Sequence, residues 1–167
     1  MKLRSEEPGD FEAIDRVNRS AFGQPDEAEI VARLRISEAF IPGLSIVAEE
    51  DHEVVGHILF TRVQLDPPSE VRVISLAPMA VLPDRQRRGI GSELVRRGIE
   101  VATDLGEEVV VVVGHPEYYP RFGFELASGF GLTNPLPGVE EAFFAKTLRD
   151  DVRIPSGEVV YPREFGE

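Results

Sequence analysis

The 167-residue sequence contains no cysteine, and among its 18 basic residues only Lys2 and Lys146 are lysines. The absence of cysteine excludes disulfide bonds, cysteine-ligated zinc and thiolate nucleophiles. No apolar run approaches the roughly 18 residues that a membrane-spanning helix needs. The N-terminal segment turns acidic at once and lacks the apolar core of a secretory signal. We therefore expect a cytoplasmic protein with no membrane partner.

Negative charge dominates the sequence. Thirty acidic residues against 18 basic ones give a formal net charge of −12. Such a surface repels nucleic-acid phosphates, so we expect no nucleic-acid partner. It favours a cationic acceptor, although an acidic surface that only keeps the protein soluble explains the charge equally well. The scarcity of lysine fits either genome composition or a salt-rich cytoplasm.

Length and composition are those of one globular domain. With 42% hydrophobic residues, the chain suits a single domain over residues 1–167. The last part, about 150–167, holds Pro155, Gly157 and Pro162. These residues predict an irregular C-terminal tail packed on the surface.

Hydrophobic periodicity and turn residues predict a mixture of strands and helices. Strands are expected at residues 2–5, 44–50, 53–65, 71–82, 109–113, 124–126 and 141–148. Helices are expected after Pro8, after Asp26, over 89–105 and, as a short turn, over 116–122, with a loop at 128–138. The five consecutive valines of 109–113 predict a strand buried on both faces, as in a parallel pair. Residues 71–113 are then one strand–helix–strand unit with a right-handed crossover.

The junction between strand 71–82 and the following helix has the features of an anion site. It reads Leu82-Pro83-Asp84-Arg85-Gln86-Arg87-Arg88-Gly89-Ile90-Gly91. The first N–H groups of a helix have no partner within it and carry partial positive charge, so they bind phosphates. Gly89 and Gly91 let the backbone approach an anion without a Cβ in the way. The alternative interpretation is an ordinary helix start that happens to contain glycine.

Two common phosphate-binding patterns do not fit this junction. A dinucleotide fingerprint requires a third glycine where this sequence has Leu94. A P-loop requires a Gly-Lys-Ser/Thr string, and the sequence has none. The pattern that does fit is Gln/Arg-x-x-Gly-x-Gly/Ala, which resembles the coenzyme A turn of the GNAT N-acetyltransferases.

Further segments extend this resemblance over nearly the whole chain. Those most similar to the YhbS-like branch of the GNAT N-acetyltransferase superfamily are Val55–Phe60, Leu76–Pro83, Tyr118–Phe124 and Gly157–Phe165. The resemblance implies the α/β (α+β) GNAT fold: a central, mixed, mostly antiparallel twisted sheet with helices on both faces and a splayed parallel strand pair at about 71–82 and 109–113. It also implies an acyltransferase that moves the acetyl group of acetyl-CoA to a primary amine. Because one fold can host several functions, a non-catalytic acyl-CoA-binding or regulatory domain is the alternative.

The resemblance also implies roles for individual residues. Those expected to hold the cofactor are Met79, Ala80, Val81, Gln86, Arg87, Arg88, Gly89, Ile90, Gly91 and Ser92. The first three would act through backbone groups of the splayed strand, and Pro78 suits a strand that stops pairing there, as it would suit an ordinary edge strand. The segment His115–Phe124 is similar to the superfamily's Tyr-x-x-x-Gly-Phe segment. By register, the tyrosine that protonates the departing thiolate is Tyr119, with Tyr118 the weaker choice.

Several features of the reaction stay open at this stage. Without cysteine, we expect direct attack of the amine in a ternary complex. The general base is His57, His115 or water, but His57 shares a strand face with Leu59 and Val63, which favours a buried structural histidine. The acceptor is a small-molecule amine or a peptide or protein amine, and the donor is acetyl-CoA or carries a larger acyl group. No metal is expected, and a monomer and a homodimer are both compatible with the sequence.

Overall fold

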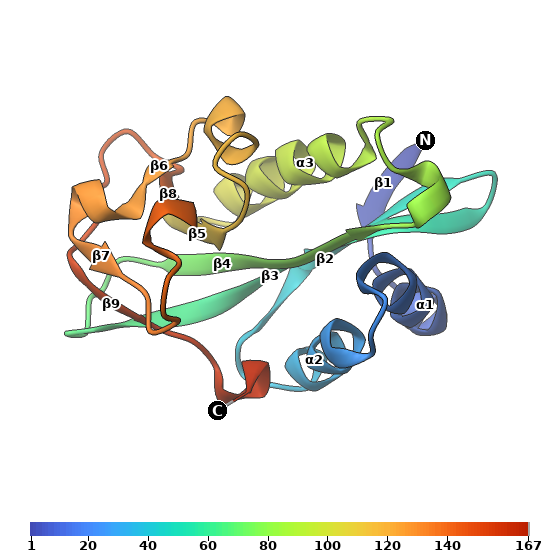
Figure 1. Ribbon diagram of the computed structural model, residues 1–167, viewed down its shortest axis with the longest axis horizontal. Coiled ribbons are helices and arrows are strands. Elements are labelled where there is room, and N and C mark those ends of the chain that lie inside the picture. Colours follow the sequence, from blue (N-terminus) through green and yellow to red (C-terminus); the bar gives the residue numbers. More distant parts are fainter. Residues whose placement is uncertain (167) are drawn as a thin grey trace. The chain divides into compact units, whose positions relative to one another are not determined.

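The computed structural model describes residues 1–166, which form nine strands and three α-helices (Figure 1). The strands are β1 (Lys2–Ser5), β2 (Phe40–Glu50), β3 (Glu53–Asp66), β4 (Val73–Val81), β5 (Val109–Val113), β6 (Glu125–Leu126), β7 (Leu132–Thr133), β8 (Phe143–Thr147) and β9 (Gly157–Val160). The helices are α1 (Phe11–Phe22), α2 (Asp26–Arg35) and α3 (Ile90–Asp104). No helix among residues 1–166 has the length and apolar character that crossing a membrane requires.

Contacts between residues divide the chain into two compact units. Among residues 1–166, the first unit comprises 1–61, 77–101 and 163–166, and the second comprises 62–76 and 102–162. Hydrogen-bonded strand neighbours follow the order β1-β2-β3-β4-β5-β8-β6, and β9 pairs with both β3 and β7. The expectation of a single domain over 1–167 stays a prediction.

The first unit is built on antiparallel strands. β1 pairs with β2 from Lys2↔Glu49 to Ser5↔Ile46, and β2 pairs with β3 across a tight hairpin. Asp51 and His52 form that turn with φ angles of +48° and +64°. Two residues with positive φ are what a two-residue hairpin needs to match the twist of its strands. The hairpin joins the two strands that the sequence predicts at 44–50 and 53–65.

Helices cover both faces of the sheet in this unit because successive residues of β3 point to opposite sides. On one side Phe60 contacts α3, where a Cβ on Gly98 would lie 2.2 Å from the Phe60 ring. On the other side His57 lies 3.4 Å from the side chain of Asn18 in α1. Helices α1 and α2 lie side by side on that second face, as Figure 1 shows.

The second unit is organised around the valine strand. β5 pairs in parallel with β4 over Val73–Ser75 and Val109–Val111, and antiparallel with β8 along its whole length. Four of the five valines are buried, and only Val113 at the end reaches 36% exposure. The predictions of a buried parallel strand and of a strand–helix–strand unit are confirmed. The last part of β4, from Ala77 to Val81, belongs to the first unit.

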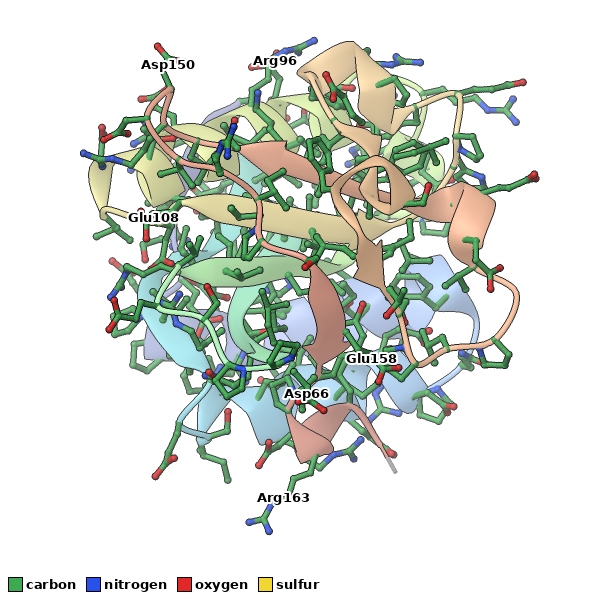
Figure 2. All side chains as sticks on the ribbon, turned by 90° about the vertical axis from the view of Figure 1, so that its left-hand side faces the viewer. Asp66, Arg96, Glu108, Asp150, Glu158 and Arg163 are labelled. Carbon is green, nitrogen blue, oxygen red and sulfur yellow. The ribbon has the colours of Figure 1, made fainter. Side chains whose placement is uncertain are left out.

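The C-terminal segment is more ordered than the sequence indicates. The irregular tail predicted for 150–167 contains β9, which pairs antiparallel with the end of β3 and parallel with β7. Val159 is 1% exposed and belongs to the apolar core of the second unit. Figure 2 shows Asp66 and Glu158, which face each other in this pairing. The prediction was wrong for Gly157–Val160, because a segment of four residues is too short for a periodic pattern and this strand forms only through distant partners.

A buried carboxylate ties together three segments of the second unit. Glu107 is fully buried and accepts two hydrogen bonds of 2.5 Å from the guanidinium of Arg62 in β3. Arg72, just before β4, donates a third bond of 2.9 Å. Burial alone would raise the pKa of Glu107, but the bonds from Arg62 and Arg72 outweigh it and lower the pKa. Glu107 is therefore a carboxylate at neutral pH, and it fixes the strand ends where β5 begins.

Candidate active site

The turn between β4 and α3 has the local geometry of an anion-binding helix start. The chain leaves β4 through a 3₁₀ turn (Pro83–Arg85), in which the Arg85 N–H donates to Leu82 O at 2.8 Å. Gly89 has a φ of +83° and a Cβ there would meet nothing within 4 Å, so its backbone faces open space. The helix begins with the bond from the Glu93 N–H to Gly89 O at 3.0 Å. The N–H groups of Ile90 and Gly91 precede that bond and have no acceptor within the helix.

Gln86 connects this turn to the strand before it. Its side-chain Nε2 donates to the Val81 carbonyl at 3.0 Å. The bond fixes the spacing between the end of β4 and the residues that precede α3. One member of the predicted cofactor set, Gln86, thus has a clear local role in shaping the turn.

Two of the turn's three arginines have no carboxylate partner among residues 1–166. Arg85 pairs with Asp84 at 2.8 Å and with Glu50 at 3.5 Å. Arg87 and Arg88, by contrast, are exposed and form no ion pair within residues 1–166. In a chain with a net charge of −12, two unpaired guanidinium groups beside a helix N-terminus make a local site for an anion.

The end of β4 lies in the same unit as this turn. Met79 and Val81 are half-buried and alternate with Ala80, which is 3% exposed. Pro78 lies within β4, and the parallel register with β5 covers Val73–Ser75, before the proline. The structure therefore brings all ten predicted cofactor residues together in the first unit.

Tyr119 lies in the second unit, at the start of a short 3₁₀ helix (Tyr119–Phe122). The residue is 7% exposed, and the rings of Tyr118 and Phe124 meet its ring edge-on, with centroids 5.0 and 5.7 Å away. Burial, and to a smaller extent the neighbouring Tyr118, raises the pKa of Tyr119 to about 12. Its hydroxyl is therefore protonated at neutral pH and able to donate a proton.

A cleft of about 420 Å³ in the same segment is lined by His115, Pro116, Glu117, Tyr118 and Arg121. The Arg121 guanidinium lies 4.8 Å above the Tyr118 ring, a cation–π contact. His115, a candidate base, is exposed in this cleft. Its role as a base stays a prediction.

His57 is a structural residue rather than an accessible base. It is fully buried, its Nε2 lies 2.8 Å from Ser45 Oγ, and Asn18 Nδ2 lies 3.4 Å from its Nδ1. Burial, and secondarily the positive charge of Arg35, lowers the pKa of His57 to about 3. The interpretation of His57 as a buried, hydrogen-bonded histidine is confirmed.

The partners of His57 were not identified from the sequence. Ser45 Oγ donates to Glu6 Oε1 at 2.5 Å, and Glu6 in turn binds the guanidinium of Arg35 at 2.9 and 3.1 Å. The chain His57–Ser45–Glu6–Arg35 thus links β3, β2 and the residue after β1 to the end of α2. Its members are separated by up to 51 positions, and no spacing or motif in the sequence marks them as neighbours.

Comparison with known proteins gives a consistent result. A model of the Acetyltransferase (GNAT) family matches residues 11–124. The uncharacterized N-acetyltransferase YhbS of Escherichia coli is 35% identical over 99% of this chain and 98% of its own length. The uncharacterized N-acetyltransferase YjhQ of the same organism is 42% identical over 79% of this chain and 74% of its own length.

Two solved structures agree with this result. The crystal structure of YhbS from Escherichia coli in complex with CoA superposes with a TM-score of 0.92 at 32% identity, covering 99% of this chain and 92% of that one. A GNAT family acetyltransferase from Brucella melitensis in complex with acetyl-CoA gives 0.82 at 33% identity, covering 98% and 97%. The resemblance and the mixed α/β fold expected from the sequence are both confirmed, and the chain belongs to the GNAT acetyltransferase family.

Proposed function

We propose that this protein is an acetyl-CoA-dependent N-acetyltransferase that acetylates a primary amine by direct attack in a ternary complex. The observation that carries the proposal is the turn before α3. There the backbone of Gly89 is accessible, and Arg87 and Arg88, which form no ion pair within residues 1–166, supply positive charge. The family supports it, since two similar chains are uncharacterized N-acetyltransferases by name and two similar structures are complexes with CoA or acetyl-CoA.

The residues of the turn suit the pyrophosphate of coenzyme A. The backbone N–H groups of Gly89–Gly91 would bind phosphate oxygens, with Arg87 and Arg88 adding charge-assisted bonds. Backbone groups of Met79–Val81 would hold the pantetheine arm, and one of their N–H groups would stabilise the oxyanion that forms as the amine attacks.

In the reaction, Tyr119 would donate one proton and a base would accept another. The neutral amine nitrogen attacks the thioester carbonyl, a C–N bond forms, and the C–S bond breaks. Tyr119 gives its proton to the departing thiolate, which leaves as free thiol. The proton that the amine nitrogen loses passes to a base, either His115 or a water molecule. A route through an acetyl-cysteine is excluded because the chain has no cysteine.

The net charge of the protein indicates only the charge of the amine acceptor, not its identity. The net charge of −12 favours acceptors that are cationic in solution, whether a small amine or the amine of a peptide or protein. Because an ammonium group with a pKa of about 10.4 attacks only after losing its proton, transfer should speed up as pH rises through neutrality. No nucleic acid or membrane is part of the proposal.

Calorimetric titration with acetyl-CoA tests the cofactor site. Wild-type protein should bind at micromolar strength, and Gly89→Asp should weaken binding at least tenfold, about 1.4 kcal/mol, by placing a carboxylate at the anion site. Gly138→Asp is the matched control, since Gly138 also has a positive φ, +76°, and open space around it. Unchanged binding in Gly89→Asp would remove the cofactor from this turn, and no binding by wild type would refute the proposed function.

A further inference from the structure

The ring of Tyr119 lies directly on the backbone of Gly114, the residue that follows β5. A Cβ built on Gly114 would lie 2.2 Å from Cε2 and 2.9 Å from Cδ2 of the Tyr119 ring. Carbon atoms do not approach so closely, because van der Waals contact is optimal at about 3.5–4.0 Å. The tyrosine ring therefore occupies the space that any side chain at position 114 would need.

Glycine at position 114 is needed for this contact and not for backbone conformation. The φ angle of Gly114 is not positive, so this angle does not require glycine at the position. The backbone is also held in place, since the Gly114 N–H donates to Ala142 O at 2.9 Å. A side chain at 114 would therefore push the Tyr119 ring away rather than move the strand end.

Phe124 is a second residue that packs against the Tyr119 ring. It is 2% exposed, and its ring meets that of Tyr119 edge-on at 5.7 Å with an interplanar angle of 79°. Such edge-to-face pairs attract each other and also favour one relative orientation of the two rings. The Tyr119 ring thus contacts both the backbone of Gly114 and the buried ring of Phe124.

We propose that Gly114 and Phe124 are positioning residues that fix the direction of the Tyr119 hydroxyl. The inference rests on the proposed function, in which that hydroxyl protonates the leaving thiolate. A general acid works only within hydrogen-bond reach of the atom it protonates, and a displacement of about 1 Å lowers the rate by about 10²-fold. Both residues act through Tyr119, which each of them contacts.

Replacement of Gly114 by alanine tests the proposal in the full-length protein. Gly114→Ala should lower kcat by about 10- to 100-fold, while the acetyl-CoA dissociation constant measured by calorimetry changes less than about threefold. Gly129→Ala is the control, because a Cβ on Gly129 meets nothing within 4 Å and its φ is not positive. That variant should keep wild-type kcat.

A double-mutant cycle separates positioning from a general loss of structure. Tyr119→Phe keeps the ring but lacks the hydroxyl, so adding Gly114→Ala to it should lower kcat by no more than about threefold. An equal loss in both backgrounds would mean that Gly114 does not act through the hydroxyl, and would overturn the proposal. If Gly114→Ala does not fold, Phe124→Leu takes its place in the cycle and is combined with Tyr119→Phe.

Failure of this inference is distinguishable from failure of the proposed function. If wild type transfers acetyl and Tyr119→Phe is impaired, but neither Gly114→Ala nor Phe124→Leu lowers kcat, positioning alone is refuted. If Tyr119→Phe retains full activity, the acid is another group and the positioning role falls with it. A wild type that binds acetyl-CoA but acetylates no amine refutes both.

Discussion

Replacement of Tyr119 by phenylalanine is expected to lower kcat by about 10²- to 10⁴-fold, the usual contribution of a general acid. The change removes one oxygen and keeps the ring that packs against Tyr118 and Phe124. Acetyl-CoA affinity should stay close to that of wild type, because the hydroxyl acts on the leaving thiolate and not on the bound thioester. Steady-state assays of thiol release, with calorimetry for binding, measure both quantities.

Tyr118→Phe is the internal control for this result. Tyr118 is the neighbouring residue and is half-buried, and it contacts Arg121 through its ring face, which phenylalanine retains. Its variant should keep kcat within about threefold of wild type. If Tyr118→Phe lost activity and Tyr119→Phe did not, the register chosen from the Gly123-Phe124 pair would be wrong and the acid would be Tyr118.

The largest expected effect on stability is that of Glu107→Ala. Removing this buried carboxylate leaves the guanidinium groups of Arg62 and Arg72 without their partner, and breaking a buried ion pair typically destabilises a protein by about 3–5 kcal/mol. Part of this is relieved because Arg72 is about half exposed and can be hydrated. Denaturant unfolding at neutral pH should give the difference. Glu100→Ala, which breaks only an exposed pair with Arg97, should have a much smaller effect.

The effect of Glu107 should depend on pH in a defined direction. Its pKa is lower in the folded chain than its ordinary value, so the ionised form of Glu107 is more stable in the folded state than in the unfolded state. The stabilisation is fully present above the unfolded pKa of about 4.3 and is lost as pH falls through the folded pKa. The difference in unfolding free energy between wild type and Glu107→Ala should therefore narrow in acid. A constant difference down to strongly acidic pH would contradict the assignment.

Features encoded by neighbouring residues could be predicted from the sequence. The valine strand and α3 have strong local patterns, and both appear within two residues of their predicted ends. The turn at Gly89 was also predictable, because a positive φ and an open backbone follow from glycine itself. The burial of His57 followed from strand alternation.

Features that depend on distant residues could not be predicted. The bond between Ser45 and Glu6 joins residues 39 positions apart, and β9 becomes a strand only through β3 and β7. Gly114 resembles any loop glycine until the Tyr119 ring is seen to lie on it. The cofactor residues lie in one unit and Tyr119 in the other, so their joint action on one thioester stays a prediction.

The most direct test of acetyl transfer is thiol release from acetyl-CoA by the purified protein with a panel of amines: polyamines, amino acids, peptides with free N-termini and lysine-containing peptides. Mass spectrometry of the amine should accompany it. We expect at least one amine to raise thiol release above the hydrolysis rate, with one N-acetylated amine formed per thiol. Tight binding of acetyl-CoA with no amine-dependent release would contradict the proposed transferase activity and identify an acyl-CoA-binding domain instead.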